Sequence, residues 1–165
     1  MMGSGNDSKK RNRNPPSPPR WAVMAQRFYE DATIDLEAAR ENVRPRRYHF
    51  AVFHSAQAAE KAVKAAHWHL LAEEPKWTHQ TDELASAVAG PAGGIPGGAW
   101  QAIIQLLSAQ VVTRYPSSNI NMPIPSDLID EAAATAAVDR ATEVLEWVRS
   151  LLQLPIGKPK RKKSY

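Results

Sequence analysis

Apolar residues recur every three or four positions along most of this chain, and this spacing restricts its fold more than any other feature. Side chains with that spacing share one face of an α-helix. The strict alternation that is typical of half-buried β-strands is absent from the sequence. Several helices with one apolar face each can bury those faces only against one another, so we predict an all-α, antiparallel up-and-down bundle of four to five helices.

Prolines and polar connections delimit the first three expected helices. Two long helices are expected at residues 21–43 and 47–72, on either side of Pro45, because proline disfavours helical backbone in the residue before it. The second of them is rich in alanine, the residue with the highest helix propensity. A short third helix is expected at residues 81–89, where Thr81 can cap the unpaired amides.

Two further helices are expected after the glycine-rich segment 90–98, which predicts a flexible loop. The fourth helix is expected at residues 99–113, before Pro116. The last is expected to follow Ser126, a good N-cap residue, and to run to residue 154. The residues expected to face inward are Trp100, Ile103, Ile104, Leu107 and Val111 in the fourth helix, and Leu128, Ala132, Ala136, Ala141, Leu145, Val148 and Leu152 in the last.

The formal net charge of +4 comes from the two ends of the chain. Residues 1–20 carry +4 and residues 156–165 carry +5, which leaves −5 on residues 21–155. Neither end has an apolar period, so we predict two disordered basic tails around a single helical domain at residues 21–155. An acidic body repels a phosphate backbone on average, so any anion site must be local.

Several function classes are excluded or disfavoured. The chain has no cysteine, so it has no disulfide, thiolate nucleophile or cysteine-based zinc site. No apolar run approaches the roughly 18 residues of a membrane span, so we expect a cytoplasmic protein without membrane contact. Five histidines suggest a metal, but His67 and His69 would point about 200° apart on a helix. We therefore expect no metal and no cofactor.

The second expected helix carries a recognisable motif. From an aromatic start at Tyr48 it reaches residues 57–65, which read Gln-Ala-Ala-Glu-Lys-Ala-Val-Lys-Ala. This segment resembles the signature of the HEPN family, the higher eukaryote and prokaryote nucleotide-binding proteins. Other landmarks follow in the family's order: Asp35-Leu36 and Ala38-Ala39, then Thr78-His79 and Leu84, then Thr113-Arg114-Tyr115-Pro116.

The resemblance implies a helical bundle that often dimerises and that binds nucleotide or RNA. Prokaryotic members with an Arg-Tyr-Pro motif are often encoded beside a small nucleotidyltransferase, in proposed toxin–antitoxin pairs. RNase members place a histidine after an arginine with four to six residues between them, and they cut RNA without metal. After Arg114 the corresponding positions are Asn119, Ile120 and Asn121, so we expect no catalytic residue of that type. Gln110 and Ser117 also depart from the family's usual tyrosine and acidic residue.

The expected nucleotide or anion site combines residues from the second and fourth helices. Lysine ammonium groups and a planar arginine fork bind phosphate oxygens, and histidine or tyrosine can contact a base or ribose. The expected site residues are Gln57, Glu60, Lys61 and Lys64, which follow helical steps, together with His79, Arg114 and Tyr115. Alternatively, Glu60 and Lys64 form an ordinary pair worth about 0.3–0.5 kcal/mol on a solvated face. Arg114 has two alternatives: a favourable cation at a helix C-terminus, or a clamp on Glu60 or another carboxylate.

Three functions therefore stay open. The first is a protein that binds nucleotide or RNA, as a homodimer or with a nucleotidyltransferase partner. The second is a metal-independent RNase toxin that uses a rearranged histidine, His79 or His54. The third is a non-catalytic helical interaction module, because five tryptophans are many for this length and a surplus tryptophan often anchors a partner.

Overall fold

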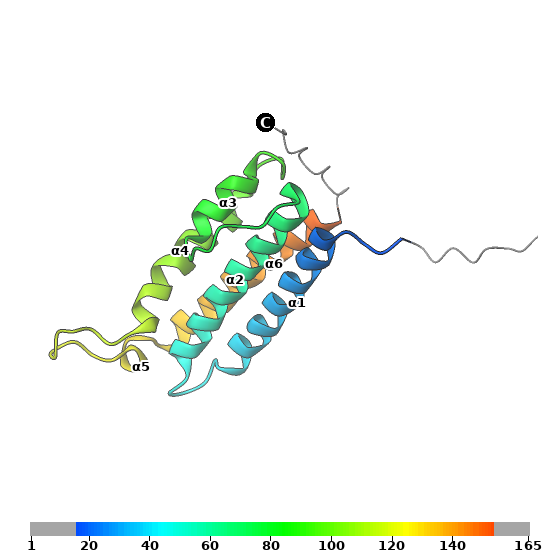
Figure 1. Cartoon of the computed structure of the whole chain (residues 1–165). Helices are drawn as coiled ribbons and strands as arrows, with labels where there is room; N and C mark the ends of the chain where they lie inside the picture. The colour runs from blue at the N-terminus through cyan, green and yellow to red at the C-terminus, as the bar shows by residue number, and fades with distance from the viewer. Residues whose placement is uncertain (1–15, 154–165) are drawn as a thin grey trace, which may run out of the picture.

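A computed structural model of the chain describes residues 16–153, and every regular element in that range is a helix. The predicted tails lie largely outside the described residues, at 1–15 and 154–165. Consecutive long helices run in opposite directions, as the colour gradient of Figure 1 shows. The prediction of an all-α bundle is confirmed. The long helices are α1 (Arg20–Glu41), α2 (Tyr48–Leu71), α4 (Gly97–Arg114) and α6 (Glu131–Leu152), and the short ones are α3 (Thr81–Ala89) and α5 (Pro125–Leu128).

Helix α2 is the centre of the bundle, in contact with α1, α3, α4 and α6. Alanine suits this position because it favours the helix and its short side chain lets neighbouring helices approach closely. The buried alanines of α2 pack with Val52 and Val63, with Leu36 from α1, and with Ile103 and Val148 from α4 and α6. The face of α2 on which a polar residue lies therefore determines which neighbouring helix that residue contacts.

The expected N-cap of α3 is wrong. Thr81 is the first residue of the helix and is buried, while Gln80 occupies the cap position without a side-chain hydrogen bond. The Thr78 hydroxyl instead accepts a hydrogen bond from the Gln80 amide at 3.0 Å, within the connection that precedes α3.

The expected start of the last helix at Ser126 is also wrong. Pro125 and Ser126 belong to the single turn α5, and the backbone is extended at Ile129 and Asp130, with ψ of 120° and 176°. That extended pair interrupts the helix. Asp130 then caps α6, because its Oδ1 accepts a hydrogen bond from the Ala133 amide at 2.8 Å.

Some residues that were expected to face inward are exposed. Val111 is 74% exposed and Leu128 43%, and Ala132 is exposed as well. The loop between α4 and α5 extends beyond the helices (Figure 1), and at the end of α4 Gln110 and Thr113 are buried while the outward-facing side chains are exposed. We name the exposed apolar side chains here the apolar end surface: Val111, Val112, Tyr115, Ile120, Met122, Ile124 and Leu128.

Membrane-spanning helices were also sought among the described residues. None of the helices there combines the length and the apolar character that crossing a membrane requires.

Candidate functional site

An open hollow of about 550 Å³ lies between the first half of α2, the end of α4 and the connection before α3. Sites for small ligands usually measure about 300–1,000 Å³. The hollow is lined by Phe50, Phe53, His54, Gln57, His79, Thr113, Arg114 and Tyr115. It is the candidate site because four of the residues expected from the sequence, Gln57, His79, Arg114 and Tyr115, meet there.

One face of α2 forms a wall of the hollow. Phe50, Phe53, His54 and Gln57 are spaced by three and four residues, so their side chains share one helix face. Phe50 is 45% exposed, which leaves part of its ring open to a ligand. Gln57 was expected from the sequence and the two phenylalanines were not, although their helical spacing from Gln57 indicates that they share its face.

The end of α4 supplies the cation of the hollow. Arg114 is the last residue of α4. This is the position expected for a cation that interacts favourably with the C-terminal end of a helix. Tyr115 is extended (φ −142°, ψ 146°) and its side chain is 78% exposed. Between residues 16 and 153 the structure contains no ion pair from Arg114 to a carboxylate, so the expected clamp on Glu60 is not found. The guanidinium is therefore available to a ligand in the hollow.

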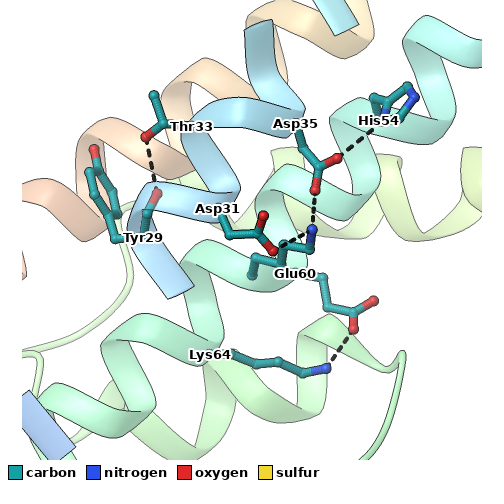
Figure 2. Close-up of polar contacts among 8 residues, drawn as sticks. Tyr29, Asp31, Thr33, Asp35, His54, Glu60 and Lys64 are labelled. Atoms are coloured by element: carbon teal, nitrogen blue, oxygen red, sulfur yellow. Dashed lines mark hydrogen bonds and ion pairs between the residues drawn. The ribbon is translucent and has the colours of Figure 1, made fainter. Parts of the chain in front are cut away.

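Glu60 connects the hollow to the interior of the bundle. Its Oε1 accepts a hydrogen bond from the Lys64 ammonium at 2.6 Å, and its Oε2 lies 3.1 Å from His79 Nδ1. The Glu60 and Lys64 side chains, whose contact Figure 2 shows, are only 5% and 11% exposed, so the interpretation of this pair as one on a solvated face is wrong. Lys64 Nζ also lies 5.8 Å from the centre of the Trp77 ring. These contacts hold the Lys64 ammonium beside Glu60 and Trp77, and Lys64 does not line the hollow.

Lys61 lies on the side of α2 that faces α1. Its ammonium is 2.6 Å from Asp35 Oδ2 and 2.7 Å from Asp31 Oδ2. Burial lowers the pKa of Lys61, but hydrogen bonds and charge from the two aspartates outweigh it and raise the pKa above its usual 10.5. The side chains of successive residues leave an α-helix about 100° apart. Lys61 therefore projects in a different direction from Glu60, whose carboxylate contacts His79 of the hollow. The expected grouping of both lysines with Arg114 is therefore not found.

Two histidines of the hollow are each held by a carboxylate. His54 Nδ1 lies 3.1 Å from Asp35 Oδ1 (Figure 2), and His79 Nδ1 lies 3.1 Å from Glu60 Oε2. When Nδ1–H of a neutral imidazole donates to a carboxylate, the lone pair is on Nε2. Asp35 also binds Lys61, so one aspartate of α1 orients two side chains of α2. Both histidines were expected from the sequence as candidate site residues. The pairing of His54 with Asp35, which lies on α1, was not expected.

No candidate metal site was found in the described part of the chain. Between residues 16 and 153 no three histidine, aspartate or glutamate side chains group in a way that could hold a metal ion. The chemistry that the described residues of the hollow offer is that of a guanidinium, two imidazoles, an amide and aromatic rings.

Comparisons with known proteins agree with the sequence motif. The HEPN domain profile matches residues 25–151, from α1 to the last turn of α6. The crystal structure of TT1696 from Thermus thermophilus is similar, with a TM-score of 0.69 and 25% identity over 78% of this chain and 98% of that one. ST0689, an archaeal HEPN homologue, is similar with a TM-score of 0.63 and 25% identity over 79% of this chain and 98% of its own. A search of curated proteins gave no match.

Proposed function

This chain belongs to the HEPN domain family, and from that premise we propose that it binds a nucleotide or an RNA strand in the hollow between α2 and α4. The observation that carries the proposal is the position of Arg114 beside the exposed aromatic rings of Phe50 and Tyr115. A guanidinium binds two phosphate oxygens at once, and exposed aromatic rings stack on bases. Gln57 and His79 add polar groups that can bond to a base edge or ribose.

Isothermal titration of ATP, GTP and a short RNA against the wild type and Arg114→Ala tests this proposal. A charge-assisted hydrogen bond contributes about 1.5–3 kcal/mol, so loss of the guanidinium should weaken binding by roughly tenfold or more. Arg114→Lys keeps the charge but loses the planar fork, and should bind with intermediate affinity. Arg27→Ala, which removes an exposed arginine of α1, is the control and should bind like the wild type. Absence of heat from every ligand with the wild type would contradict the proposal.

The two carboxylate-bound histidines favour a second function, RNA cleavage without a metal ion. Nε2 of one histidine takes the proton of a ribose 2′-hydroxyl, and the 2′-oxygen attacks the adjacent phosphorus. The bond from phosphorus to the 5′-oxygen breaks, and the other histidine, in its protonated form, donates the proton to that oxygen. The products are a 2′,3′-cyclic phosphate and a 5′-hydroxyl, and Arg114 stabilises the charge on the phosphoryl oxygens.

Incubation of the protein with RNA in EDTA tests cleavage separately from binding. Positioned acid or base groups contribute about 10²–10⁴-fold, so His54→Ala and His79→Ala should each slow cleavage by at least 100-fold. The two variants, purified in the same way, also control for a contaminating nuclease. Intact RNA with the wild type, together with binding in the titration, would retire cleavage and keep the binding function.

We also propose that the chain forms a homodimer through the apolar end surface. Seven large apolar side chains are exposed there, and Ile120 is 95% exposed. Residues 115–126 contain no charged residue, so two copies can meet on this surface without repulsion between like charges. Sedimentation should show a dimer for the wild type and a monomer for Ile120→Glu/Ile124→Glu, and a monomeric wild type would contradict this proposal.

We also propose a protein partner and a cellular location. A small nucleotidyltransferase as partner, and a role in a toxin–antitoxin pair, would be tested by co-expression with the neighbouring gene and co-purification. A cytoplasmic location is likewise a prediction. The interaction module is less favoured because Trp77 is exposed but Trp68 and Trp147 are buried, so the described tryptophans form no exposed patch.

A further inference from the structure

We propose that the connection between α1 and α2 is a second phosphate-binding surface, formed by Arg44, Arg46 and Arg47. The ligand is then a single-stranded polynucleotide that lies over this surface and enters the hollow. This inference rests on the proposed function of the hollow, and it narrows the ligand from any nucleotide to a strand.

The charge of this connection differs from that of the rest of the body. Residues 21–155 carry −5, yet three arginines lie within the four residues 44–47. All three are exposed, and among residues 16–153 the structure contains no ion pair that involves them. Glu41 is the nearest carboxylate along the chain, and within residues 16–153 no ion pair joins it to these arginines. The arginines are therefore available for external phosphate groups.

This surface lies about one helical turn along the chain from the hollow. The Arg47 carbonyl accepts a hydrogen bond from the Phe50 amide at 2.9 Å, so Arg47 lies one helical turn before a residue that lines the hollow. Three residues of helix rise about 4.5 Å. The α1–α2 connection also lies at the same end of the bundle as the end of α4, which carries Arg114 (Figure 1). A ligand longer than one nucleotide that occupies the hollow can reach both sets of cations.

The connection that carries the three arginines is ordered, and Arg46 has a positive φ. Its φ is 66°, in the left-handed region that glycine and asparagine adopt most readily. The connection around it is ordered by hydrogen bonds, including Arg47 N–H to the Arg44 carbonyl at 3.0 Å. The ordered connection therefore holds the three exposed arginine side chains on a defined backbone.

Aromatic rings adjoin these cations. Tyr48, His49 and Phe50 follow directly after Arg47, and the rings of His49 and Phe50 have centroids 4.0 Å apart. Cations beside partly exposed aromatic rings are the arrangement that binds single strands, since the cations contact phosphates while the rings stack on bases. Phe50 lines the hollow and lies three residues after Arg47, so it is the point where the strand would pass from the arginines to the hollow.

Binding of 12-nucleotide RNA and DNA strands, and of AMP, at several salt concentrations tests the inference. We expect at least one strand to bind more tightly than AMP. The triple variant Arg44→Ala/Arg46→Ala/Arg47→Ala should weaken strand binding at least tenfold and leave AMP binding unchanged. It should also reduce the slope of log affinity against log salt by roughly 2, because single strands contribute about 0.7 per phosphate contact. The control Arg27→Ala/Lys76→Ala/Arg149→Ala removes the same charge from exposed positions elsewhere and should bind like the wild type.

The two proposals can fail separately. If AMP binds but the triple variant binds strands like the wild type, the second surface is overturned while the function of the hollow stands. If neither AMP nor any strand binds the wild type, both are overturned. The variant Arg46→Gly distinguishes an effect on binding from an effect on folding. Glycine adopts the left-handed backbone without strain, while the positive charge of the arginine is lost. We expect an unfolding temperature no lower than that of the wild type and a two- to fivefold weaker strand affinity, and unchanged affinity would count against Arg46.

Discussion

Glu60 on α2 and His79 in the connection before α3 are 19 residues apart in the sequence, and their side chains meet at 3.1 Å. The other oxygen of Glu60 holds the buried Lys64 ammonium at 2.6 Å. The Glu60 carboxylate thus contacts both the buried ammonium of Lys64 and the imidazole of His79 in the hollow. The stability of the bundle and the geometry of the site are therefore linked at Glu60.

Glu60→Gln should lower the free energy of unfolding by about 3 kcal/mol, because it leaves the Lys64 charge buried without its partner. Lys64 is 11% exposed, so water can replace the carboxylate only in part. Urea unfolding at neutral pH measures the change. The double variant Glu60→Gln/Lys64→Met removes both charges and should recover most of the loss. A Glu60→Gln protein as stable as the wild type would show that the pair does not stabilise the fold.

His67 should make the protein less stable in weak acid. Burial lowers the pKa of His67 below its usual 6.5, and the hydrogen bond that its Nδ1–H donates to the Glu73 carbonyl offsets this only in part. As pH falls through 6.5, the unfolded chain takes up a proton before the folded protein does. The stability that His67 contributes is fully present above pH 6.5, and it is lost as the pH falls toward the lower pKa that His67 has in the folded protein.

The test compares urea midpoints at pH 7.5 and 5.5 for the wild type and His67→Gln. The variant cannot gain the proton, so its midpoint should fall less between the two pH values than that of the wild type. Equal losses in both proteins would place the acid sensitivity elsewhere.

Gly90 and Gly94 should respond to alanine in opposite directions. A Cβ at either position meets nothing within 4 Å, so space does not decide the outcome. Gly90 has φ −61° and ψ −60°, which alanine adopts readily, whereas Gly94 has φ +102°. Gly90→Ala should therefore stabilise the protein by about 0.4–1 kcal/mol, and Gly94→Ala should destabilise it by more than that. Unfolding curves of the two single variants measure both changes, and a shift of the same sign in both would contradict the backbone argument.

Asp130→Ala should lower the free energy of unfolding by about 1 kcal/mol, because the Ala133 amide loses the acceptor that caps α6. Asp130→Asn keeps a side-chain oxygen at the same place and should retain most of the stability. Ser126→Ala is the informative control, since Ser126 lies within α5 and makes no N-cap for α6. If Ser126→Ala lowered the free energy of unfolding more than Asp130→Ala, Ser126 would be the N-cap of the last helix, as the sequence predicted.

The positions of the helices and the family followed from the sequence because their signals are local. Helix α2 was expected at residues 47–72 and spans Tyr48–Leu71, and α3 begins and ends where it was expected. Apolar spacing and proline positions act within a few residues, so they can be read along the chain. The predicted start of α6 was wrong because Ser126 and Asp130 are both good N-cap residues. Only the tertiary structure, in which α5 packs against α2 and α4, selects between them.

The site depended on the tertiary structure. Sequence spacing fixes the angle at which each side chain leaves α2, but it does not say which neighbour covers that angle. Packing placed α1 opposite Lys61, whose ammonium binds Asp31 and Asp35, and it buried Lys64 against Glu60. The sequence by itself thus determined that this chain forms a helical HEPN domain. Only the arrangement of its helices decided that Arg114 lines the hollow without a carboxylate partner among residues 16–153, while both lysines pair with carboxylates of the bundle.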